Sequence, residues 1–212
     1  MDYGAYKCIH EIRKMQIKAV IFDLDGTITQ PYFDFDAIRE EIGLAKDSGP
    51  VLESMEKMTV EQRRNAEEIL HNHEQKAVIE SQLNPNARQT LLALRKAGIR
   101  IGVLTRNRRD NAFAIAEKHG LEFDTVIGRE DGPVKPDAFG VLQICEQFGI
   151  KPKEALLVGD YLFDLQCAKS AGAVAVLLAN HNQADEFVEY ADFRIEDISE
   201  ILDIIDGKIT IK

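Results

Sequence analysis

Two hydrophobic patterns alternate along most of the chain. Short apolar runs predict buried strands, and apolar residues recurring every three or four positions between them predict helices. The predicted strands are residues 19–22, 99–104, 123–127, 155–158 and 174–178, with a shorter one near Phe193. Repeated strand–helix units joined by short loops are typical of an α/β fold. We therefore expect a doubly wound, mostly parallel sheet with helices on both faces.

Several polar residues mark where the helices begin and end. Asn84 is a candidate N-cap followed by Pro85 at the first helical position, and Gly98 is expected to end that helix. Asp137 is expected to cap the helix before the strand at 155–158, and a last helix is predicted over 198–205. Near the N-terminus, a short amphipathic helix that packs on the core is predicted by Tyr6, Ile9, Ile12 and Met15.

Residues 30–84 differ from the rest because they contain no convincing strand and carry twelve acids against six bases. Phe35, Ile38 and Ile42 form one helical stripe, and Thr59 with Gln62 is a candidate capping box for a long helix. The sequence therefore predicts a helical cap at 30–84, inserted into an α/β core formed by 1–29 and 85–212.

Composition narrows the classes of partner. The formal charge of -10 argues against nucleic acid or an anionic membrane as a partner. No apolar stretch approaches the roughly 20 residues that span a bilayer, and the N-terminus lacks the features of a signal peptide. Three widely separated cysteines form no close-spaced metal pair and are expected to be reduced thiols, so a cytoplasmic protein is predicted.

The strand at 19–22 ends in polar residues that suggest chemistry. Asp23 and Asp25 are two positions apart, so in an extended backbone their side chains point the same way. Two carboxylates held that close repel each other, and a bound cation is the natural compensation. The alternative is an ordinary turn closing a strand, because Asp and Gly26 are common turn residues.

Further polar residues follow other predicted strands. In open α/β sheets ligands bind beyond the carboxyl ends of the strands, where Asp23, Thr105 and Asp160 all lie. Lys135 and Thr105 could hold a phosphate, and the carboxylates could hold magnesium, which prefers hard oxygen ligands. Individually, Thr105 is more often only a strand-end residue and Lys135 only a solvated charge. Together they predict a phosphoryl-transfer site whose candidate metal ligands are Asp23, Asp25, Asp160 and Asp164.

Four motifs in chain order resemble the haloacid dehalogenase superfamily of aspartate-dependent phosphohydrolases. They are DLDGT at 23–27, Thr105, Lys135 followed by Pro136, and GDYLFD at 159–164. The helical insert is similar to the small cap of phosphoglycolate-phosphatase-like members. The resemblance implies that Asp23 attacks phosphorus, that Asp25 is the general acid and base, and that Thr105 and Lys135 hold the phosphoryl oxygens. It also implies that Asp160 binds Mg²⁺ directly, whereas Asp164 binds it through water or orients Lys135.

The expected function is a magnesium-dependent phosphatase that acts on a small phosphorylated metabolite. Arg106 is a further candidate phosphate ligand, although it could equally begin the next helix. A phosphomutase using the same site is one alternative. A phosphorylation-switched receiver domain is another, but the insert and the second acidic pair, Asp160 with Asp164, argue against it.

Overall fold

The computed structural model describes residues 16–208. The helix predicted from Tyr6 to Met15 lies outside the described residues. The described part of the chain divides into two compact units, one formed by 16–30 and 82–208 and a smaller one formed by 31–81.

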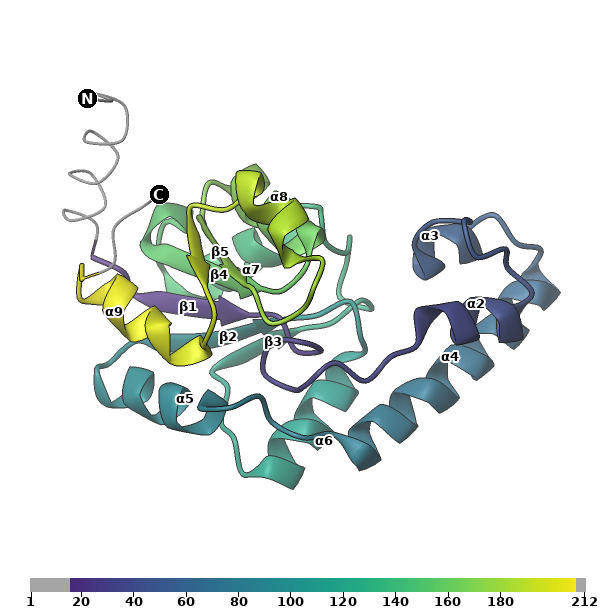
Figure 1. Cartoon of the computed structure of the whole chain (residues 1–212), viewed down its shortest axis with the longest axis horizontal. Helices are drawn as coiled ribbons and strands as arrows, with labels where there is room; N and C mark the ends of the chain where they lie inside the picture. The colour runs from purple at the N-terminus through teal and green to yellow at the C-terminus, as the bar shows by residue number, and fades with distance from the viewer. Residues whose placement is uncertain (1–15, 209–212) are drawn as a thin grey trace. The chain divides into compact units, whose positions relative to one another are not determined.

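The larger unit is built on a six-stranded, fully parallel sheet in the order β3-β2-β1-β4-β5-β6 (Figure 1). The strands are β1 (Ala19–Phe22), β2 (Arg100–Leu104), β3 (Thr125–Ile127), β4 (Ala155–Gly159), β5 (Val174–Leu178) and β6 (Phe193–Ile195). The predicted fold class is confirmed. Strand β1 lies at the centre, between β2 and β4, so residues following it stand at the middle of the sheet's carboxyl edge.

Helices cover both faces of this sheet. α7 (Phe139–Phe148) and α8 (Leu162–Ala171) pack together on one face, whereas α5 (Ala87–Lys96), α6 (Arg109–His119) and α9 (Ile201–Ile205) lie on the other (Figure 1). Short 3₁₀ segments occur at Pro152–Glu154, Ala184–Tyr190 and Ile198–Glu200. No helix among residues 16–208 combines the length and the apolar character needed to cross a bilayer.

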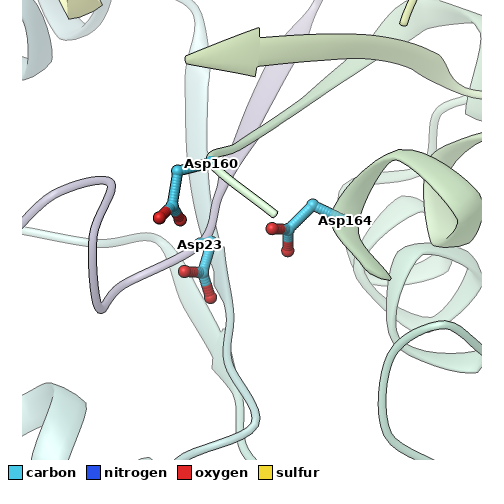
Figure 2. Close-up of side chains that lie close together, drawn as sticks. All are labelled: Asp23, Asp160 and Asp164. Carbon is cyan, nitrogen blue, oxygen red and sulfur yellow. The ribbon is translucent and has the colours of Figure 1, made fainter. Parts of the chain in front are cut away.

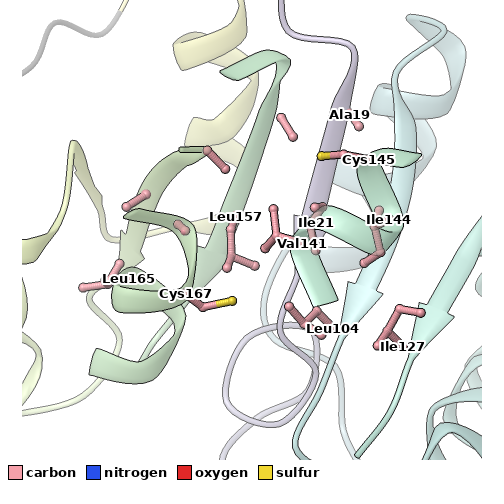
Figure 3. Packing of buried hydrophobic residues seen from close by; sticks show 14 of the residues in the cluster. Ala19, Ile21, Leu104, Ile127, Val141, Ile144, Cys145, Leu157, Leu165 and Cys167 are labelled. Carbon is pink, nitrogen blue, oxygen red and sulfur yellow. The ribbon is translucent and has the colours of Figure 1, made fainter. Parts of the chain in front are cut away.

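The main core fills the space between the sheet and helices α7 and α8 (Figure 3). Ala19 and Ile21, two positions apart on β1, belong to this cluster because alternate residues of a strand share a face. Val141 and Ile144 contribute from α7 and are fully buried. A Cβ added at Gly102 on β2 would lie 3.0 Å from Ile144 Cγ2, so glycine lets α7 approach the sheet closely.

The smaller unit contains three helices, α2 (Phe35–Ile42), α3 (Val51–Met55) and α4 (Val60–Glu80). Gly43 ends α2 in the left-handed conformation at φ 82°, and Thr59 with Gln62 forms the predicted capping box at the start of α4. Buried residues of the three helices make a separate core, formed by Ile38, Val51, Met55, Ala66 and Leu70.

Three local predictions differ from the structure. Asn84 is not the N-cap of α5, which begins at Ala87 after Asn86 in a left-handed conformation (φ 62°). The strand predicted over 123–127 is shorter, because Asp124 uses its carboxylate to accept a hydrogen bond from Ile101 N of β2 (2.7 Å). The helix predicted over 198–205 begins as a 3₁₀ turn, capped by Asp197, before it becomes α9.

Candidate active site

The loop after β1 brings the first motif to the carboxyl edge of the sheet. Asp23 continues the strand, since its backbone N–H donates to Val158 O of β4 (2.8 Å). Gly26 has φ 94°, and a Cβ there would lie 2.4 Å from Asp160 Oδ2. Both the backbone conformation and the close approach therefore require glycine at this position.

Two asparagines from distant segments hold this loop. Asn84 Nδ2 lies 2.9 Å from Gly26 O, 2.8 Å from Thr27 O and 3.1 Å from Thr29 O. Asn180, which follows β5, donates through Nδ2 to the same Gly26 O (2.7 Å). The side chain of Asn84 therefore stabilises the site loop, which is why it does not act as the predicted helix cap.

Three carboxylates converge at the edge of the sheet (Figure 2). Asp23 comes from the end of β1, Asp160 from the end of β4 and Asp164 from the first turn of α8, and each contributes an oxygen within 4.8 Å of the others. Gly159 permits this approach, because a Cβ there would lie 2.1 Å from Asp164 Cγ. The side chain of Asp25 is not among the three.

Lys135 is the cation that faces this group. Its ammonium is buried, donates to Asp23 Oδ1, and lies 2.6 Å from Asp164 Oδ1. Arg106 supports the lysine, because its guanidinium donates to the Lys135 carbonyl and stacks 4.8 Å from the centre of the Phe163 ring. The Lys135 ammonium thus neutralises part of the charge of the three acids. The Arg106 guanidinium holds the backbone of Lys135 in place.

The charges of the group shift each other's protonation. Burial raises the pKa of Asp23 well above 3.8, and Asp164 and Asp160 raise it further, against the opposing effect of Lys135. Burial also raises the pKa of Asp160 to about 6, with Asp164 adding to the shift. The pKa of Lys135 is raised, since its two carboxylate partners outweigh the cost of burial. The lysine is therefore protonated, and the group still carries excess negative charge.

Thr105 and Asp25 lie in a second part of the site, joined by Asn107. Thr105 is buried, and its Oγ1 accepts a hydrogen bond from Asn107 N (2.9 Å), which leaves the hydroxyl hydrogen to donate elsewhere. Asn107 Nδ2 donates to Asp25 Oδ2 (3.1 Å). The hydroxyl that follows β2 and the second acid of the first motif are thus connected through one amide side chain.

The structure places the candidate residues as follows. Asp23, Lys135, Asp160 and Asp164 form one contact group, whereas Arg106 contacts the backbone of Lys135. Sequence reasoning assigned no role to Thr27, whose Oγ1 donates to Asp160 Oδ1 (3.2 Å). It also missed His181, whose Nε2 lies 2.8 Å from Asp160 O. His181 and Asn180 follow β5 directly, so the rule that sites form at strand ends could have found them.

The donor set fits a small, hard cation. Three carboxylates supply oxygen ligands of the kind that magnesium prefers, and their mutual repulsion makes a divalent cation favourable among them. The buried lysine beside them is suited to an anion such as a phosphoryl group. A carboxylate, a cation site and an ammonium within one group can together bring a nucleophile to a phosphate ester.

Known proteins match this chain over most of its length. A family model described as haloacid dehalogenase-like hydrolase matches residues 17–172. An uncharacterized hydrolase of Saccharomyces cerevisiae, YOR131C, is 33% identical over 198 residues, which cover 89% of this chain and 91% of the yeast protein. The phosphoglycolate phosphatase of Chromobacterium violaceum is 27% identical, over 89% of this chain and 96% of its own.

A solved structure extends the likeness to the fold. The HAD-superfamily hydrolase of subfamily IA, variant 1, from Geobacter sulfurreducens superimposes with a TM-score of 0.62 at 27% identity. The match covers 89% of this chain and 99% of the Geobacter chain.

Proposed function

Since this chain belongs to the haloacid dehalogenase-like hydrolase family, we propose that it is a magnesium-dependent phosphatase that hydrolyses a small phosphorylated metabolite through an aspartyl-phosphate at Asp23. The observation that carries the proposal is the contact of Asp23 with Lys135, within the group that also contains Asp160 and Asp164. The Asp23 carboxylate therefore lies beside the Lys135 ammonium, which can bind an anion, and beside two carboxylates that can bind a metal ion.

The first half of the reaction uses Asp23 and Asp25. The Asp23 carboxylate attacks phosphorus, the bond from phosphorus to the leaving oxygen breaks, and that oxygen takes a proton from Asp25. Lys135 and the Thr105 hydroxyl bind the phosphoryl oxygens and stabilise the charge that develops on them. In the second half, Asp25 takes a proton from water, which attacks phosphorus and releases inorganic phosphate and free Asp23.

Asp160 and Asp164 are the proposed metal ligands together with Asp23, because these three side chains converge. When bound, magnesium would neutralise negative charge on the phosphoryl group and on the attacking carboxylate. Asp25, which was also a candidate ligand by sequence, is proposed to act in proton transfer. Arg106 was a candidate phosphate ligand, and we propose that it steadies Lys135, because it binds the Lys135 carbonyl.

The substrate class is proposed from the relatives. The named relatives include phosphoglycolate phosphatases and an N-acetylmuramic acid 6-phosphate phosphatase, which act on small phosphorylated metabolites. They support a phosphatase over the phosphomutase and receiver alternatives. We propose that residues 31–81 form a cap that selects among such substrates, and that the protein works in the cytoplasm, where thiols such as Cys145 and Cys167 stay reduced.

The proposal is tested by phosphate release from a broad panel of phosphate monoesters, with added Mg²⁺ and with a chelator. We expect turnover of at least one ester that stops in the chelator and in Asp23→Asn, whose amide is close in shape but cannot attack phosphorus. Full activity in the chelator would refute the metal requirement, and appreciable activity of a folded Asp23→Asn would refute the nucleophile.

A further inference from the structure

We propose that Asn107 is a positioning residue that holds the proton donor Asp25 in its working orientation, an inference that rests on the proposed function. Asn107 is only 6% exposed, and its Nδ2 donates to Asp25 Oδ2 at 3.1 Å. The two residues are 82 positions apart, one after β1 and the other after β2. The contact is therefore a product of the fold.

The orientation of the Asn107 amide is set by two further hydrogen bonds. Its Oδ1 accepts from Arg108 N at 2.7 Å and from Asn111 Nδ2 at 2.8 Å. Because an amide side chain carries its acceptor and its donors on opposite sides, two donors at Oδ1 turn the NH₂ group toward Asp25. Asn111 is buried in the first turn of α6, so the helix itself fixes this arrangement.

The same residue is tied to the phosphate-binding side of the site. Asn107 N donates to Thr105 Oγ1 at 2.9 Å. This hydrogen bond fixes how far the Thr105 hydroxyl, which binds the phosphoryl group, lies from Asp25, which protonates the leaving oxygen. A proton donor is effective only when it is held within hydrogen-bond reach of the oxygen it protonates.

Leaving-group dependence distinguishes this role from a merely structural one. p-Nitrophenol departs readily without a proton, whereas phenol departs poorly without one, so loss of proton donation harms phenyl phosphate more. The comparison uses kcat/KM, which reports the steps up to departure of the leaving group. Hydrolysis of the aspartyl-phosphate, which is common to both esters, does not enter it.

The test variant is Asn107→Asp. Its carboxylate keeps acceptors for Arg108 N and Asn111 Nδ2 but presents an oxygen to Asp25 in place of a donor. We expect kcat/KM for phenyl phosphate to fall about 100-fold or more, as for loss of general acid catalysis, and that for p-nitrophenyl phosphate to fall less than about 10-fold. Asn107→Ser, which adds no charge, should show the same ordering and serves if Asn107→Asp does not fold.

Two further variants separate the possible outcomes. Asp25→Asn should show the same dependence on the leaving group, and Gln89→Glu, an exposed position on α5, should leave both esters unaffected. Equal losses for both esters in folded Asn107 variants, alongside a leaving-group-dependent loss in Asp25→Asn, would overturn the positioning role alone. Equal losses in Asp25→Asn itself would overturn the proposed role of Asp25, and the role of Asn107 with it.

Discussion

Replacing Asp160 by asparagine should stabilise the metal-free protein while it weakens the stabilisation by magnesium. Asp160 is largely buried, with 14% of its side chain exposed, and it lies beside two other carboxylates. Asparagine has nearly the same shape, and its Oδ1 can still accept the hydrogen bond from Thr27 Oγ1. The substitution therefore removes a buried charge without removing its packing.

The magnitude follows from the pKa of Asp160, which burial raises from 3.8 to about 6. Because the folded-state pKa exceeds that of the unfolded chain, ionisation of Asp160 lowers the stability progressively between about pH 4 and pH 6, and the full cost is present above about pH 6. A shift of about 2 pKa units corresponds to about 3 kcal/mol at most. We expect Asp160→Asn to raise the free energy of unfolding by about 1–3 kcal/mol at pH 7.5, since neighbouring groups relax in part.

The assay is urea unfolding at pH 7.5, in EDTA and in excess Mg²⁺. Magnesium should stabilise the wild-type protein by mass action, by about 3 kcal/mol when its concentration is about 100 times the dissociation constant. The variant should gain much less, because it has lost a ligand. Glu189→Gln removes an exposed acid of the same unit and should change neither measurement.

Two results would refute this reasoning. A folded Asp160→Asn that is less stable than the wild-type protein in EDTA would show that the carboxylate stabilises the fold. Equal stabilisation of both proteins by magnesium would show that Asp160 does not bind the ion.

Three further predictions concern the pH dependence of Asp160→Asn, the two buried thiols and the smaller unit. The stability advantage of metal-free Asp160→Asn should be near zero at pH 4 and grow until about pH 6, because the folded wild-type protein binds more protons than the unfolded chain in that window. An advantage independent of pH would show that the charge of Asp160 is not its cause. Burial raises the pKa of Cys145 to about 11 and that of Cys167 to about 12, so both thiols should resist a thiol reagent at pH 8 until the protein is unfolded. Rapid labelling of either cysteine in the native protein, mapped by mass spectrometry, would contradict this prediction. Replacing residues 34–80 by a short glycine-serine linker should leave a folded core that hydrolyses p-nitrophenyl phosphate, whereas hydrolysis of the best metabolite of the panel should fall much further. Equal losses of activity for both esters would contradict a cap that selects substrates.

Local pattern predicted the strands well, and it placed two of the candidate acids at one edge of the sheet. Apolar runs such as 155–158 are buried on both faces, and the residue after each run stands at the carboxyl edge of the sheet. Asp23 and Asp160 could therefore be placed together from the amino-acid sequence alone, because parallel strands bring their ends to one edge. Lys135 joins them through a loop, and only its place in the motif order indicated it.

Hydrogen bonds between distant segments could not be predicted from local pattern. Asn84 followed by Pro85 has the local chemistry of a helix start. In the structure, however, the Asn84 side-chain amide donates to three carbonyl groups of the loop after β1. Asn107 and Asn111 are four residues apart at the start of a helix. That spacing does not indicate that Asn107 also donates a hydrogen bond to Asp25. Such networks depend on which loops the fold brings together.

Trapping of the phosphorylated enzyme shows whether Asp23 carries the phosphoryl group during turnover. Asp25→Asn with p-nitrophenyl phosphate should form the aspartyl-phosphate, because this leaving group needs no acid, and should hydrolyse it slowly, because no base activates water. Acid quenching followed by peptide mass mapping should find one phosphoryl group per protein, on the peptide that contains Asp23. Release of p-nitrophenol by this variant without a phosphorylated Asp23 peptide, or the same phosphopeptide from Asp23→Asn, would contradict the account.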